Sequence, residues 1–260
     1  MARRILFLFG AAVLAAMAVI VPLQATPIPG PFNDPEEACD FQGLYPAAAH
    51  VSALDADEEL FIDIHLLADR GVTPERAARI VAAAQESYTP MGLTLRIVGN
   101  EKVAFEGTGA FDLIDQARYL FPDSERPAGS DAVLLITSAD IEEAPVGKAV
   151  AGLAACVGGV GAPYYSFLVA EDPGDETSIP IGPTSFYGNL AAKILAHELG
   201  HLLGAHHHYA NCVEGVPSEA DEGEGSACTL MTNFADFISI NFGSLEAAVV
   251  RGYAEEYARP

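Results

Sequence analysis

The chain has 260 residues, of which 50% are hydrophobic and 19% are charged. This balance is ordinary for a globular core and argues against an intrinsically disordered protein. The formal net charge of −23, from 13 basic and 36 acidic residues, gives a surface that repels nucleic acid and anionic lipid. We therefore expect no nucleic-acid partner, although acidity alone identifies no ligand.

The first 25 residues have the composition of a secretory signal peptide. Arg3 and Arg4 precede an uncharged apolar run from Ile5 to Leu23, and the small residue Ala25 stands at the expected cleavage point. We therefore expect a secreted or otherwise extracytoplasmic protein. The alternative is an uncleaved membrane anchor, because roughly 18 or more apolar residues can span a bilayer.

Residues 26–57 are rich in Pro, Ala and acids and show little periodicity, so we interpret them as a linker or a short pro-segment before one domain at 58–260. The domain opens with a strand at Leu60–Leu67. A helix start then follows at Thr73-Pro74-Glu75, with a capping Thr, Pro at the first helical position and an acid in the first turn. Apolar residues keep helical spacing until Pro90 ends the helix.

Strands and helices alternate through the rest of the domain. Leu93–Val98 alternates like a strand, whereas Ala132–Thr137 is a continuous apolar run, as expected of a buried central strand. The other expected elements are a helix at Phe111–Leu120, strands at Val150–Val157 and Tyr165–Ala170, a helix at Gly188–Leu203 and a last helix at Leu245–Tyr257. This order predicts an α/β layer architecture with one mixed sheet.

The four cysteines all lie outside the expected signal peptide: Cys39, Cys156, Cys212 and Cys228. An even count in an exported chain predicts two disulfides, and the sequence leaves all three pairings open. Because the chain contains no C-x-x-C spacing, a zinc site built from cysteines is not expected.

Histidines are concentrated in the segment HELGHLLGAHH, which runs from His197 to His207. His197 and His201 are four residues apart, so on a helix both imidazoles project from one face and can reach one zinc ion at about 2.0–2.1 Å. Gly204 permits the left-handed conformation that ends a helix, and the returning chain brings His207 to the same metal. His206 and His208 stand beside His207 as less favoured ligands.

Three neutral imidazoles leave the fourth zinc position open for water, which is the arrangement of a catalytic site. Glu198 lies on the neighbouring flank of the helix, near that position. Zinc lowers the pKa of the bound water and polarises a carbonyl, while Glu198 takes the proton of the water and hands it to the leaving amine. The pattern therefore indicates a zinc endopeptidase with a polypeptide substrate. The alternative is a non-catalytic zinc-binding or membrane-anchored acidic module of the same fold.

His197, Glu198, His201, Gly204 and His207 match the extended zinc signature of the metzincin metalloproteases without a gap. Within that family the chain resembles the reprolysin (adamalysin-like) group, over roughly 58–257. Four segments carry this resemblance in order: ELFIDIHLL, AVLLIT, AGLAACVGG, and a Cys just before Met231. The resemblance implies a metzincin-like catalytic domain at 58–260. That domain has a mixed, mostly parallel five-stranded sheet, an active-site helix and a C-terminal helix.

The resemblance also implies roles for residues outside the zinc signature. Met231 would form a methionine-containing turn beneath the metal, without being a ligand. Residues Gly152, Leu153 and Ala154 would lie on the edge strand of the cleft, where an extended peptide adds by main-chain hydrogen bonds.

The same resemblance implies that Cys212 pairs with Cys228, which leaves Cys39 with Cys156. As an alternative, Cys39 is a thiolate cap on zinc in a latent form. Reprolysins carry Asp directly after the third histidine, where this chain has His208. We expect one catalytic Zn²⁺ and a monomer. A Ca²⁺ ion is kept only as an alternative, because no motif supports it.

Overall fold

The computed structural model describes residues 59–143, 148–174, 190–207, 212–213, 226–227, 229–231 and 241–258. The expected signal peptide and the linker or pro-segment lie outside these ranges. Among the helices within them, none is long and apolar enough to cross a membrane.

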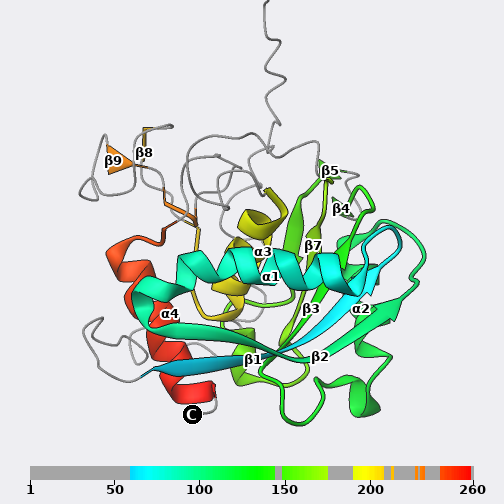
Figure 1. The fold of residues 1–260 in the computed structure, drawn as a ribbon, viewed down its shortest axis with the longest axis horizontal. Helices are drawn as coiled ribbons and strands as arrows, with labels where there is room; N and C mark the ends of the chain where they lie inside the picture. Colours follow the sequence, from blue (N-terminus) through cyan, green and yellow to red (C-terminus); the bar gives the residue numbers. More distant parts are fainter. Residues whose placement is uncertain are drawn as a thin grey trace, which may run out of the picture.

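A five-stranded sheet runs through the centre of the molecule in the order β2-β1-β3-β7-β6 (Figure 1). Its strands are β1 (Leu60–Asp69), β2 (Leu93–Val103), β3 (Ala132–Thr137), β6 (Gly152–Ala154) and β7 (Phe167–Glu171). Strands β2, β1, β3 and β7 are parallel, and β6 pairs antiparallel with β7 at the edge. The expected α/β class, with a mixed and mostly parallel five-stranded sheet, is confirmed.

Smaller elements surround this sheet in the part of the chain that the structure describes. The two-residue strands β4 (Glu142–Glu143) and β5 (Lys148–Ala149) form one pair, and β8 (Cys212–Val213) and β9 (Ser226–Ala227) form another. Short 3-10 helices are present as η3 (Thr89–Met91), η4 (Pro122–Ser124) and η5 (Gly159–Gly161).

Helices cover both faces of the sheet. They are α1 (Pro74–Tyr88), α2 (Ala110–Arg118), α3 (Leu190–Leu202) and α4 (Ser244–Tyr257). Strand β3 divides the core, because alternate side chains of a strand point to opposite faces. Leu134 and Ile136 join the larger core with α1, α3 and α4, whereas Val133 and Leu135 join a smaller core with α2. Helix α3, which carries the histidines, therefore shares its face of the sheet with α1 and α4.

Helix α1 begins where the sequence predicts. The Thr73 hydroxyl accepts a hydrogen bond from the backbone N–H of Arg76 at 3.2 Å, and Pro74 occupies the first helical position. The helix ends at Tyr88, one turn of 3-10 helix follows, and Gly92 then takes a φ of +67°. This left-handed residue turns the chain directly into β2.

Strands β1 and β7 differ from the expected bounds by no more than two residues at either end, whereas β2 and β6 differ more. Strand β2 continues to Val103 instead of ending at Val98, because β1 offers backbone partners for its exposed second half. Gly99 lies against the His65 ring within that half: a Cβ atom at Gly99 would be 2.3 Å from Nδ1 of His65. Strand β6 covers only Gly152–Ala154 of the expected Val150–Val157, because the chain turns away toward Gly158, which has a φ of +74°.

Candidate metal centre

Helix α3 is buried around almost its whole circumference. Every residue of the helix except His197 is buried, and the helix packs against β7 and α1. Such all-round burial is typical of a helix inside a protein rather than on its surface. His197 and His201 therefore project from a helix that is packed on almost all sides.

Gly204 ends the helix as the sequence predicts. It has a φ of +88°, its N–H donates to the His201 carbonyl at 2.9 Å, and the Ala205 N–H donates to the Gly200 carbonyl at 3.0 Å. This pair of bonds is the Schellman arrangement, which uses a left-handed residue to reverse the chain after a helix. The reversal carries His207 back toward α3.

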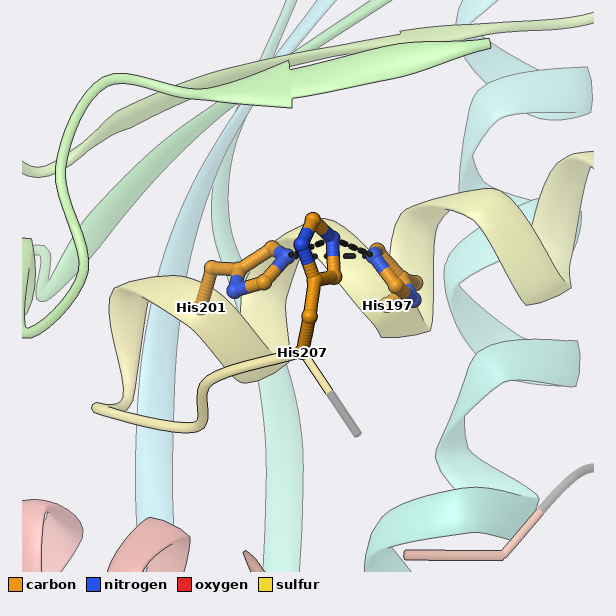
Figure 2. A group of neighbouring side chains, drawn as sticks. All are labelled: His197, His201 and His207. Atoms are coloured by element: carbon orange, nitrogen blue, oxygen red, sulfur yellow. Dashed lines mark hydrogen bonds between the residues drawn. The ribbon is translucent and has the colours of Figure 1, made fainter. Parts of the chain in front are cut away.

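The three imidazole rings meet at one point (Figure 2). The Nε2 atom of His201 lies 3.0 Å from that of His197 and 3.2 Å from that of His207, and the His197 and His207 atoms are 3.3 Å apart. Two nitrogens at about 2.05 Å from one zinc ion and at the tetrahedral angle are separated by roughly 3.3 Å. The triangle therefore has the size of one face of a zinc coordination tetrahedron.

Backbone carbonyls fix which nitrogen of each helix-borne ring carries the proton. Nδ1 of His197 donates to the Leu230 carbonyl at 2.8 Å, and Nδ1 of His201 donates to the Ala205 carbonyl at 2.7 Å. A carbonyl oxygen only accepts, so in each neutral ring Nε2 presents a lone pair. The 3.0 Å contact between these two Nε2 atoms joins two acceptors, and a cation between them removes their repulsion. The residues present fit a divalent metal ion.

Burial also keeps the rings neutral. It lowers the pKa of His197 to about 3, with a further contribution from His207, and lowers that of His207 to about 4, with a further contribution from His206. Burial holds the pKa of His201 well below its ordinary value. Because a metal ligand must be a neutral imidazole, all three side chains are in the binding form at neutral pH.

Glu198 lies between α3 and the edge strand β6. Its side chain is buried, and a Cβ atom at Gly152 would be 2.7 Å from its Cγ and 2.9 Å from its Oε1. The missing side chain at Gly152 is therefore what gives the carboxylate its space. Gly152 has a contact with the expected general base, in addition to the substrate-binding role that the sequence predicts for it.

The other two predicted substrate-binding residues, Leu153 and Ala154, follow Gly152 on β6 with buried side chains. They lie on opposite faces of the sheet, since Leu153 joins the smaller core and Ala154 the larger one. A peptide beside this strand would thus meet their main chain, and substrate binding by them remains a prediction.

Met231 lies beneath α3. It is fully buried, and its sulfur would be 2.9 Å from a Cβ atom at Gly200, the residue before His201. The preceding residue, Leu230, supplies the carbonyl that accepts from His197. The expected turn at Met231 therefore touches the histidine helix at two points.

The predicted disulfides fall mostly outside the described side chains. Cys156 is disulfide-bonded and fully buried. The side chains of Cys39, Cys212 and Cys228 are not among those described, so the pairing of all four remains a prediction. His208 also lies outside the described residues, and His206 is absent from the group of three that the structure brings together.

The carbonyls of Leu230 and Ala205 are the functional groups that sequence reasoning misses. Every residue carries a carbonyl, so no residue type in the sequence marks the two that orient His197 and His201. Gly152 gives a weak signal, because a glycine inside a strand often marks a close approach.

No protein-family model matches the chain. The chain is similar to the crystal structure of archaemetzincin from Methanopyrus kandleri, with 19% identity, 78% of this chain and 99% of that chain covered, and a TM-score of 0.47. It is also similar to metalloproteinase-II from Bacteroides fragilis, with 16% identity, 81% and 56% covered, and a TM-score of 0.44. A chaperone–substrate complex matches at 16% identity, 78% and 35% covered, and a TM-score of 0.45. At these identities and TM-scores, the likenesses assign no function.

Proposed function

We propose that the protein is a zinc-dependent endopeptidase of the metzincin type. The observation that carries this proposal is the triangle of Nε2 atoms, 3.0–3.3 Å apart, formed by His197, His201 and His207. These three residues would hold the ion. A zinc ion there supplies Lewis-acid chemistry, which acidifies a water molecule and polarises the scissile carbonyl.

Glu198 is the residue that moves the proton. It follows the first ligand on α3, takes no place in the histidine triangle, and has its carboxylate beside Gly152 on β6. As general base it accepts a proton from the attacking water, and as general acid it returns that proton to the leaving amine. A peptide that adds by main-chain hydrogen bonds to β6, the edge strand of the described sheet, would pass next to this carboxylate.

The finer features of the proposal rest on the sequence. Within the metzincins we place the chain nearest the reprolysin-like group, by the order of its strand segments and the Cys before Met231. The same proposal includes export by the residue 1–25 segment, a polypeptide substrate and a monomeric state. It also includes the disulfide pairs Cys212–Cys228 and Cys39–Cys156.

Replacing Glu198 with Gln tests the chemistry directly. The variant keeps the size of the side chain and all three histidines, so we expect it to retain one zinc ion per chain. Casein hydrolysis should fall by about 10²–10⁴-fold, the usual contribution of a general base. Glu125→Gln, at an exposed position, is the matched control and should cleave at the wild-type rate. Undiminished cleavage by the Glu198 variant would remove Glu198 from the mechanism. A zinc-loaded wild type without peptidase activity would instead favour a non-catalytic module.

A further inference from the structure

Helix α4 packs against two segments that support the metal centre, although none of its residues belongs to the group of three histidines. Its first turn lies beside the segment that orients His197, and its second half lies beside the turn that follows His201. These two contacts involve different residues and different parts of the site.

The first contact is made by Glu246. One carboxylate oxygen accepts from the Gly243 N–H at 2.7 Å, and the other accepts from the Thr229 hydroxyl at 3.0 Å. Beside Thr229, the Leu230 N–H donates to the Asn241 carbonyl at 2.7 Å. Because the Leu230 carbonyl accepts from Nδ1 of His197, the start of α4 fixes the group that orients the first ligand.

The second contact is made by Tyr253, which is fully buried. A Cβ atom at Gly204 would be 2.3 Å from its Cε2, and one at Gly158 would be 2.9 Å from its Cε1. Opposite edges of the ring thus touch two glycines, both of which have positive φ.

Both of these glycines bind the backbone of the second ligand. The Gly158 N–H donates to the His201 carbonyl at 2.8 Å, and the Gly204 N–H donates to the same oxygen at 2.9 Å. The turn that contains Gly204 also supplies the Ala205 carbonyl that accepts from the His201 ring, and it leads to His207. The Tyr253 ring therefore packs on the backbone that places two of the three histidines.

We propose that α4 is a positioning element for the metal centre, with Glu246 setting His197 and Tyr253 setting His201 and His207. This inference rests on the proposed zinc site and adds that zinc affinity depends on a helix that contributes no ligand. Groups that orient metal ligands typically change affinity by about 10–100-fold when they are removed.

The test uses the full chain with Tyr253→Leu, which removes the ring, and Glu246→Ala, which removes both acceptors. We expect each variant to raise the zinc dissociation constant, measured by chelator competition, by about 10–100-fold. We also expect the visible spectrum of the cobalt-substituted protein to change, because that spectrum reports the geometry of the ligands.

Two controls separate positioning from general stability. Phe167→Leu removes a fully buried ring from the smaller core, on the opposite face of the sheet, and should lower the melting temperature without changing zinc affinity. Glu256→Ala removes an exposed charge from α4 itself and should leave the affinity unchanged.

Wild-type zinc affinity and an unchanged cobalt spectrum in both test variants would overturn the inference. If Tyr253→Leu does not fold, Glu246→Ala decides the question by the same two measurements. A wild-type protein that binds no zinc would defeat the proposed function itself, which is a different result from a zinc-binding wild type whose variants bind equally well.

Discussion

Single residues position Glu198, the proposed general base, as firmly as they position the three histidines. Glu198 extends toward β6, and the strand leaves room for it only because residue 152 is a glycine. The absence of a side chain at residue 152 thus lets the carboxylate lie against the edge strand that we propose to bind the peptide.

Gly152→Ala should therefore impair catalysis without emptying the metal centre. The new methyl group would lie within 3.0 Å of both Glu198 and Ile194, so the carboxylate must shift. Because a misplacement of about 1 Å can reduce a rate by roughly 10²-fold, we expect kcat/KM to fall by about that factor. The zinc content should stay at one ion per chain.

Ala151→Ser is the control for this change, because it enlarges the neighbouring side chain by one atom at an exposed position, whereas Glu198 is buried. Equal activity of Gly152→Ala and wild type would show that the contact has no catalytic role.

The sequence predicts the site at residue level where side-chain type and spacing determine chemistry. The four-residue interval of His197 and His201, and the glycine that returns the chain to His207, suffice to predict the triangle of nitrogens. The contacts of Glu246 and Tyr253 could not be predicted in this way, because they join segments that are far apart in the chain. Only the folded arrangement brings an ordinary Glu or Tyr to the backbone of the site.

Among the elements, the C-terminal end of α3 matters most for the metal centre. Its left-handed residue, Gly204, both terminates the helix and touches the Tyr253 ring. A side chain at residue 204 would strain the left-handed backbone, and it would also clash with the Tyr253 ring.

Gly204→Ala should lower the free energy of unfolding by more than backbone strain alone accounts for. A left-handed alanine costs about 1–2 kcal/mol, and the ring contact adds to that cost. We expect the free energy of unfolding, measured by urea denaturation, to fall by more than this range. Zinc binding should also weaken. Gly174→Ala is a close control, since Gly174 has the same φ of +88° and none of the described residues has an atom within 4 Å of the added methyl. Equal losses in the two variants would contradict a role for the ring contact.

Prediction of the elements succeeds where local signals coincide. Helix α1 has a capping Thr, a Pro at its first position and regular apolar spacing, and β3 is a continuous buried run, so both were predictable. The second half of β2 is exposed and polar, and it becomes a strand because β1 pairs with it. Strand β6 is shorter than the apolar run in the sequence, because Cys156 and Val157 lie in a buried turn that follows the strand. Buried turn residues are apolar like buried strand residues, so the sequence alone does not distinguish them.

At the scale of the whole molecule, the protein is strongly acidic, and we propose that it is exported. The net charge of −23 and the basic, then apolar, start of the chain are both properties of the sequence. Export would bring the cysteines into an oxidising compartment, where disulfides persist.

The exported protein should begin near Thr26. Cleavage after Ala25 removes the apolar run, so N-terminal sequencing of the protein in the medium or the extracytoplasmic fraction should find a start at that point. A membrane-bound protein that retains Ile5–Leu23 would support the anchor alternative instead.

The proposed activity requires the three histidines to hold one zinc ion, and this can be measured as metal bound per chain. Metal-free protein is dialysed against zinc, freed of excess ion and analysed by elemental mass spectrometry, with His201→Gln as the comparison. His201 is fully buried and in contact with both other ligands, so its loss should open the triangle. We expect one zinc ion per wild-type chain and none in the His201 variant. A wild type without zinc, or a variant that still holds one ion, would contradict the account.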